Sequence, residues 1–388
     1  MKIRIVDTDN EFDALEKPWN QLSEKTSPNF FSSFDYVRAA WKHFRGSRDR
    51  LYILVLSEGP SIIGIAPFYI GRCRRWRIPH RAIKWIATWE GDRPRLLVGE
   101  NEEMCWNEIF RFLKSQKHSW EVLDLVEQPM NGPEGRGWSF LPRSGWYWEK
   151  SSDAIDYYIS LEGSWEDYLK GLDPDTRHQW NRRKRRLSSN PGGYEIEQIS
   201  DPEGIREALS RFVAIEQESW KAKAGIGVGK DERTLLFYQD LLVRLAGKGN
   251  AFIYFLKRGG ETIAGKICFI QRDVVYSLHT TYLPAYAAYS PGILVGADLI
   301  QKLFGRPYRE LDLLAMREDG APPKHKTDWA TGRRETVRFT AYRVHSRLLP
   351  YVIVKRLEHI LKRGRRGKPE AKENEKAQRD ALHLVEKA

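Results

Sequence analysis

The sequence predicts a mixed α/β protein, with mostly antiparallel sheets flanked by helices, built as two similar halves. Two observations support this fold class, and a third indicates where the folded part of the chain ends. Short apolar runs typical of strands alternate with longer runs of helical spacing along most of the chain. The stretches LYILVLSEGPSIIGIAPFYI and AFIYFLKRGGETIAGKICFI share a strand, a glycine turn and a second strand with an internal glycine. From about residue 350 the chain is rich in Lys, Glu and Arg and poor in aromatic residues.

The first half, residues 1–150, begins with an alternating strand at 2–6 and an amphipathic helix within 10–26. FFSSFDYVRAAWKHF predicts a second helix, with Ser32 or Ser33 as its N-cap. Gly59-Pro60 joins two apolar runs and predicts a hairpin. A further helix is expected in NEEMCWNEIFRFLKSQ, between short strands. These elements form the first predicted domain.

The second half, residues 151–348, repeats this plan. We expect helices in 164–189, 202–223, 234–249 and after Ser290, and strands at 153–161, 193–200, 251–282 (three strands) and 309–315. Residues 349–388 are predicted to form a short charged helix, to about residue 362, followed by a flexible basic tail. A duplicated α/β unit is the simplest explanation of the two similar hairpins, and a chance likeness is the alternative.

Charge, cysteine spacing and hydropathy limit the classes of function that this sequence could have. The formal net charge of +12 favours anionic partners, although a solvated basic surface would have the same charge. The three cysteines, Cys73, Cys105 and Cys268, lack the spacing of a disulfide framework or a zinc site, so no metal is expected. The N-terminus carries acids where a signal peptide needs an apolar core, and no apolar run would span a bilayer. The expected location is therefore the cytoplasm.

The junction YAAYSPGILVGADLIQKLF is the clearest candidate site. Ser290 is placed as an N-cap, and Pro291 suits the first helical position because no helical N–H is needed there. Gly292 would allow a ligand or another segment to approach the backbone closely. A helix start presents unpaired N–H groups and the positive end of the helix dipole, so an anion can bind there. A well-capped helix without a ligand is the alternative.

Several motifs around this junction resemble the acetyltransferase-like domain of the CelD/FemAB-like group, a branch of the GNAT superfamily. They are RHQWNRRKRRL, IEQESWK, ETIAGKICF, YLPAYAAYSPGILV and LDLLAMREDGAPPKHKTDWA, within residues 170–335. The N-terminal FFSSFDYVRAAWKHF and SIIGIAPFYI also resemble the opening segments of this family. Leu283 and His325 depart from the family pattern, and the loop before Lys326 is long, which puts the acyl or acceptor specificity in question.

The resemblance implies two GNAT-like domains in tandem and transfer of an acyl or aminoacyl group, often to a saccharide or peptidoglycan-type acceptor. It implies acetyl-CoA or another acyl-CoA as donor. The donor's pyrophosphate is then expected at the helix start, formed by Ser290, Pro291, Gly292, Ile293 and Leu294.

Acyl transfer needs a route for the proton of the attacking amine or hydroxyl. The candidate bases are His279, in YSLHTTY, Glu216 and Glu218, in IEQESWK, and Asp312, in LDLLA. A strand histidine is equally well a packed core residue, and helical glutamates are often solvated. Asp312 in an apolar strand needs a partner, for which Lys326 is the natural choice, and an Asp–Lys pair that only pins the loop is the alternative to catalysis.

Trp220 and Trp329 are candidates for the wall of an acceptor pocket, and they would look the same as core tryptophans. Lys326 and Arg183 are further candidates for binding the substrate. The run RHQWNRRKRR, which contains Arg183, fits a solvated helix, a clamp for an anionic donor or acceptor, or a contact with tRNA or a membrane surface. A second basic cluster spans Arg72 to Lys84. No nucleic-acid-binding motif is evident.

Three hypotheses follow. The first is an acyl-CoA-dependent acyltransferase that acts on a saccharide or cell-envelope precursor. The second is a FemAB-type ligase that uses aminoacyl-tRNA. The third is a GNAT-like scaffold without catalysis, which binds partners of polysaccharide assembly through its basic face.

Overall fold

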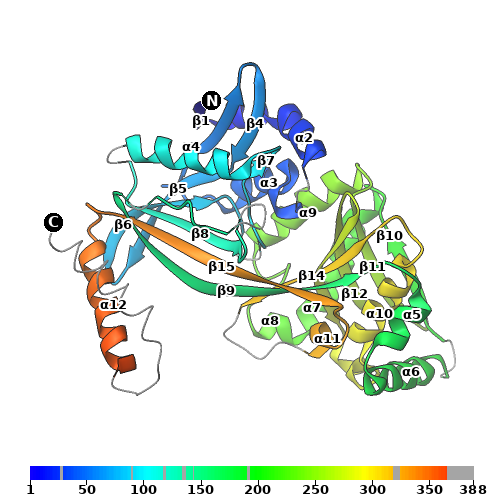
Figure 1. The fold of residues 1–388 in the computed structure, drawn as a ribbon. Helices are drawn as coiled ribbons and strands as arrows, with labels where there is room; N and C mark the ends of the chain where they lie inside the picture. Colours follow the sequence, from blue (N-terminus) through cyan, green and yellow to red (C-terminus); the bar gives the residue numbers. More distant parts are fainter. Residues whose placement is uncertain are drawn as a thin grey trace.

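The computed structural model describes residues 1–26, 29–88, 91–116, 119–132, 137–142, 144–189, 193–317 and 324–364. Within these residues the strands form two sheets (Figure 1). The smaller sheet has the order β1 (Lys2–Val6), β3 (Ile53–Glu58), β4 (Ser61–Ala66) and β7 (Leu97–Val98). The larger has the order β10 (Glu195–Ile199), β11 (Ala251–Arg258), β12 (Glu261–Gln271), β13 (Val274–Tyr282), β14 (Glu310–Arg317), β9 (Trp146–Ser160), β15 (Gly332–Arg343), β8 (Val122–Pro129), β6 (Ile78–Trp85), β5 (Phe68–Arg75) and β2 (Arg50–Leu51).

Neighbouring strands are antiparallel, apart from the parallel pairs β13–β14 and β6–β8. The mixed, mostly antiparallel fold class is confirmed. The two predicted hairpins are also confirmed, and they share an irregularity. In the first hairpin Leu56 pairs with Gly64 and Ser57 with Ile62, so Ile63 is unpaired, and in the second Ile263 is unpaired in the same way. Bulges at the same place in both hairpins support a duplicated unit.

Helices cover the sheets on both sides (Figure 1). In the first half these are α1 (Asp9–Asp13), α2 (Glu16–Lys25), α3 (Phe34–Phe44) and α4 (Glu102–Ser115). The second half has α5 (Trp165–Gly171), α6 (Pro174–Ser188), α7 (Gly204–Glu218), α8 (Trp220–Lys223), α9 (Glu232–Ala246), α10 (Pro291–Leu303) and α11 (Lys324–Thr327). Ser33 is the N-cap of α3 and accepts a hydrogen bond from the Tyr36 N–H, as predicted. The helix expected over 164–189 is divided in two before Pro174.

The two halves share a hydrophobic core. The ring of Phe30 stacks on that of Phe269 at a centroid distance of 4.6 Å, and Phe44 of α3 contacts Phe237 of α9 at 5.2 Å. Separate cores lie beneath α10 and beneath α4. Burial of these large rings supplies much of the hydrophobic stabilisation, and the shared core holds the halves together.

The long strands β9 and β15 run across both halves (Figure 1). They pair with each other from Gly332–Tyr158 to Arg343–Trp146, while β9 also pairs with β14 and β15 with β8. No strand was predicted over 332–343, and only 153–161 of β9 was predicted as a strand. Local patterns do not reveal that two distant segments pair with each other. The predicted boundary near residue 150 falls within β9, and the domain limits stay a prediction.

After β15 the chain forms α12 (Leu349–Gly364), where a charged helix was expected. The predicted flexible tail beyond it lies outside the described residues. Among the described helices, none combines the length and apolar character needed to cross a membrane.

Candidate active site

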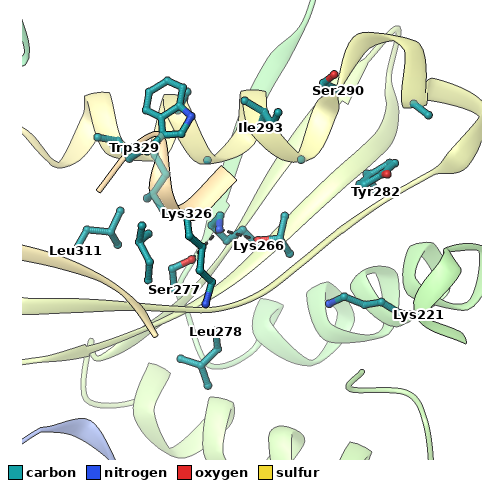
Figure 2. Close-up of a pocket in the computed structure, with 18 of the residues that line it drawn as sticks. Lys221, Lys266, Ser277, Leu278, Tyr282, Ser290, Ile293, Leu311, Lys326 and Trp329 are labelled. Carbon is teal, nitrogen blue, oxygen red and sulfur yellow. Dashed lines mark hydrogen bonds between the residues drawn. The ribbon is translucent and has the colours of Figure 1, made fainter. Parts of the chain in front are cut away.

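A pocket of about 480 Å³ opens beside the first turns of α10 (Figure 2). It forms because β13 and β14 pair in parallel only along Val274–Tyr276 and Glu310–Asp312, after which they separate. Helix α10 lies over the gap, and α8, α11 and the strands β12 to β14 complete the walls. The predicted helix start is therefore at the rim of a cavity.

The start of α10 differs from a standard N-cap. Ser290 stands at the N-cap position, but its φ of 52° is left-handed, and its side chain makes no capping hydrogen bond. The expected side-chain cap is thus absent, since Ser290 instead turns the chain between the 3-10 segment Pro284–Tyr289 and α10. The Ser290 carbonyl accepts from the N–H groups of Ile293 and Leu294. Pro291 occupies the first helical position, as predicted.

Ser290, Gly292 and Ile293 line the pocket. A Cβ atom at Gly292 would lie 3.3 Å from Tyr282 Cδ1, so glycine allows α10 to approach β13 closely. Pro291 and Leu294 are buried in the core instead of lining the pocket. Of the five residues predicted to bind the donor, three therefore face the cavity.

Three lysines from three elements extend into this space (Figure 2). Lys266 of β12 is only 8% exposed, and its Nζ donates to Ser277 Oγ and Thr280 Oγ1, both at 2.7 Å. Burial, together with the charges of Lys326 and Lys221, lowers the pKa of Lys266 to about 8. An ammonium group has three donors, so one donor of Lys266 is left for a ligand.

Lys326 and Lys221 add to the positive charge. Lys326 Nζ donates to the Leu314 carbonyl at 3.1 Å, and burial lowers its pKa. Lys221 Nζ lies 3.5 Å from Glu216 Oε1. Among the described residues no carboxylate is within ion-pair distance of Lys266 or Lys326. A buried cation without a counter-charge is costly, and an anionic ligand would offset that cost.

Both predicted tryptophans line the pocket. Trp220 is 57% exposed at its mouth, whereas Trp329 is buried against Trp180. The Trp329 carbonyl also accepts a hydrogen bond from Tyr168 Oη at 2.6 Å. Trp329 is thus a fixed wall, and Trp220 is free to contact a ligand.

The four predicted bases lie elsewhere, and the roles suggested for them stay predictions. His279 is buried, and its Nε2 is 2.7 Å from Tyr238 Oη in the core shared with α9. Glu216 is buried and accepts from the Gly229 N–H at 3.0 Å. Glu218 is exposed at the end of α7. The titratable side chains that line the pocket, within the described residues, are those of Tyr282 and the three lysines.

Asp312 does not pair with Lys326. Its Oδ2 accepts from Arg93 at 2.5 Å and its Oδ1 from the Leu314 N–H at 2.8 Å. Arg93 is buried among Asp92, Asp156 and Asp312. Burial and the neighbouring Asp92 carboxylate raise the pKa values of Asp156 and Asp312. Sequence analysis missed Arg93, which is more than 200 positions from Asp312, so no local pattern joins them.

Arg183, in α6, donates to Gln179 at 3.1 Å and does not line the pocket. Its neighbour Arg186 comes closer to α10, because its guanidinium donates to the Ala288 carbonyl at 3.2 Å and lies over the Tyr289 ring. Arg258 lies over the same ring from β11. These two arginines extend the positive charge beyond the pocket mouth.

Within the described residues no cluster of His, Cys, Asp and Glu has the arrangement of a metal site. The groups suited to a ligand are the α10 start and the three lysines, which together suit phosphates or another anion.

The comparison with known families bears on the same segment. Residues 174–326 match the acetyltransferase (GNAT) domain family. The matched segment includes α10 and two of the three pocket lysines and ends at the third, Lys326, so most of the pocket lies within the segment that is similar to this family. No curated protein has significant sequence similarity to the chain.

Solved structures extend the likeness to both halves. A structure titled FemX is 10% identical, with a TM-score of 0.58 over 88% of this chain and 97% of that chain. L-PGS from Bacillus licheniformis is 12% identical, with a TM-score of 0.51 over 89% and 95%. The C-terminal domain of a putative lysylphosphatidylglycerol synthetase from Agrobacterium fabrum is 8% identical, with a TM-score of 0.51 over 85% and 92%. At these identities the likeness shows that the fold, over both halves of this chain, is shared with these proteins.

Sequence reasoning also missed Lys266. A lysine inside an otherwise apolar strand, ETIAGKICF, was the available signal, because such a residue is rarely buried without a reason.

Proposed function

We propose that the protein is an acyltransferase that moves an acyl group from acyl-CoA to an amine or hydroxyl of a saccharide or cell-envelope precursor. Membership of the CelD-like branch is part of this proposal. The observation that carries it is the three-lysine pocket at the start of α10, within the segment that matches the GNAT acetyltransferase domain.

The pocket is suited to this chemistry. The coenzyme supplies the acyl group as an activated thioester, and its phosphates suit the helix start. The acceptor forms a bond to the acyl carbon, the carbon–sulfur bond breaks, and the acceptor's proton must end on the leaving thiolate or on solvent. Lys266, with a pKa near 8, is matched to donate a proton to that sulfur near neutral pH. Lys326 stabilises negative charge that develops on the acyl oxygen.

The acceptor would lie at the open side of the pocket. Trp220 is exposed there, and a flat aromatic surface suits the apolar face of a sugar ring. No carboxylate or histidine lies in the described pocket wall. The neutral form of Lys266 therefore takes up the acceptor's proton, and the ammonium group formed in this way gives a proton to the leaving thiolate. His279, Glu216 and Asp312 then act by holding the surrounding structure through their buried hydrogen bonds.

Isothermal titration with acetyl-CoA tests the donor. We expect Lys266→Met to weaken binding at least about tenfold, because a hydrogen bond from a charged donor is lost. Lys302→Met is the matched control, since Lys302 lies on the outer side of α10 and pairs with Asp298. Equal affinities of the Lys266 variant and the unaltered protein would overturn the proposed donor site.

The second candidate is transfer of an aminoacyl group from tRNA. It is favoured by the likeness to FemX over both halves and by the exposed arginines of α6, such as Arg182 and Arg185. RNase-sensitive activity, and tRNA binding that weakens steeply with salt, would distinguish it from the first. Absence of binding to both acetyl-CoA and charged tRNA would instead favour a scaffold without catalysis in polysaccharide assembly.

A further inference from the structure

Helix α12 carries apolar residues on two faces. Leu349, Val352 and Ile353 are buried against β6 and β15. Tyr351, Val354 and Leu357 recur at a spacing of three residues, and they are 54%, 53% and 36% exposed. Spacing of three places them along one side of the helix. Packing among the described residues buries the first face and leaves the second exposed.

The tip of the β5–β6 hairpin lies beside this second face. Its turn, Trp76-Arg77, has φ values of 48° and 67°, and Trp76 is 39% exposed. The Trp76 ring is 6.4 Å from that of Tyr351, and the Arg75 guanidinium lies 4.5 Å from the Trp76 ring centre. Figure 1 shows α12 beside this hairpin, at the opposite end of the molecule from α6. The hairpin tip and the exposed face of α12 therefore form one surface, which we call the tip surface.

We propose that the tip surface docks the protein on an anionic lipid bilayer. Trp76, Tyr351, Val354 and Leu357 would enter the interface between headgroups and acyl chains, while the surrounding arginines contact lipid phosphates. Tryptophan and tyrosine favour this interface because each ring has an apolar body and a polar edge. This inference is independent of the acyl donor, and it adds a membrane partner to the proposed function.

Charge complementarity supports a lipid partner. Arg72, Arg74 and Arg77 are exposed around the tip, and no described carboxylate lies within ion-pair distance of them. Arg72 also lines, with Arg48, Arg50 and Arg81, a hollow of about 260 Å³ beside the hairpin that has no acidic lining residue. Positive charge therefore lies next to the exposed apolar residues of the hairpin tip, as a negatively charged surface requires.

The aliphatic residues distinguish a bilayer from a nucleic acid. Single-stranded RNA would use Trp76 and Tyr351 for stacking and the arginines for phosphate contacts. It would leave Val354 and Leu357 exposed to water, whereas a bilayer covers them. A membrane therefore accounts for all the exposed apolar residues of the tip surface.

Sedimentation of the full chain with vesicles tests the proposal. We expect binding to vesicles of phosphatidylcholine with phosphatidylglycerol, and little binding to phosphatidylcholine alone. Arg74→Ala with Arg77→Ala should weaken binding by about five-fold for each arginine, and Val354→Ser with Leu357→Ser should weaken it separately. These side chains are exposed, so thermal unfolding should be unchanged in both double variants.

The matched control is Arg182→Ala with Arg185→Ala, which removes the same charge from α6. We expect this variant to keep nearly full vesicle binding. Equal losses in the α6 and hairpin variants would overturn the proposal, because general charge would then explain the binding. Absence of vesicle binding, with tRNA binding that depends on Arg74, Arg77 and Trp76, would overturn it in favour of an RNA contact.

Discussion

The units β13–α10–β14 and β6–α4–β8 have the same plan but opposite helix starts. In each, two strands pair in parallel over three residue pairs with a helix between them in sequence. Each helix follows a residue in the left-handed region, Ser290 with φ 52° and Asn101 with φ 54°. Helix α4 then begins with Glu102-Glu103, whereas α10 has no acid in its first turn. Glutamates complement the helix dipole and repel an anion, so only α10 is suited to bind phosphate.

What lies beneath the two helices also differs. Helix α4 covers a core that includes Trp85, Trp106 and Trp120, and Glu102 accepts a hydrogen bond from Trp106 Nε1 at 3.2 Å. Helix α10 lies over the buried ammonium of Lys266. The β6–α4–β8 unit therefore has a packed core beneath its helix, whereas the β13–α10–β14 unit has a cavity and the positive charge of Lys266 there. A duplicated backbone can therefore divide stability and ligand binding between its two copies.

The largest effect is expected where the halves meet. Arg93, from the first half, is the buried partner of Asp312 and Asp156 in the second. Arg93→Met should lower the free energy of unfolding by about 3–5 kcal/mol, because it leaves buried carboxylates without their cation. Urea denaturation measures this loss. Arg38→Met, which breaks the more exposed pair with Asp13, should cost about 1 kcal/mol or less, and equal losses would contradict a special role for the junction.

The charge of Lys266 should make the second half less stable than its packing permits. Lys266→Met should raise the free energy of unfolding by about 1–3 kcal/mol at neutral pH, because a desolvated ammonium is replaced by a side chain of similar length. The same change should weaken binding of acetyl-CoA, so stability and affinity move in opposite directions. A destabilised variant would show that the Ser277 and Thr280 hydrogen bonds already compensate for burial.

The lowered pKa of Lys266 should make the stability of the folded protein increase with pH. The pKa of Lys266 is lowered to about 8 in the folded protein, from an ordinary value of 10.5. Between these pH values the unfolded chain binds more protons, so stability rises with pH. Relative to Lys266→Met, the unaltered protein should gain about 3 kcal/mol across this window. A constant difference between the two denaturation series would contradict the lowered pKa, and anion binding should weaken as the pH passes 8.

The smallest effect is expected from substitutions of Ser290 that give the start of α10 features of the start of α4. Ser290→Asp places an acid at the start of α10, one position before the place where α4 has its glutamates. We expect a gain in stability of about 0.3–1 kcal/mol with weaker binding of acetyl-CoA. Ser290→Asn copies the residue at position 101 and tolerates the same backbone angles, so it should leave binding nearly unchanged. Binding of acetyl-CoA measured by calorimetry, and thermal unfolding, of the two variants distinguish the effect of the added charge from the effect of side-chain shape. Equal binding by both would indicate that the start of α10 does not contact the donor.

Much of the fold could be predicted from the sequence because periodic burial is a local property. The strand at 2–6, the two hairpins and the helices that begin near Ser33 and Pro291 follow from spacing, glycine turns and capping residues. The candidate site was predicted for the same reason, since Ser-Pro-Gly marks a helix start after a strand, and the structure has a pocket at this place. Trp220, Trp329 and Lys326 were placed in the pocket wall through the family resemblance.

Tertiary structure decided what depends on contacts between distant residues. The pairing of β9 with β15 joins the two halves into one sheet, although these strands are far apart in the sequence. The partner of Asp312 proved to be Arg93, and Lys266 became part of the site only when the neighbouring strand brought Ser277 and Thr280 to it. Local patterns in the sequence were thus enough to predict most helices and strands and the helix start beside the pocket. The burial and the charge partners of a side chain depend on the whole fold, so the chemistry of the pocket was set by tertiary contacts.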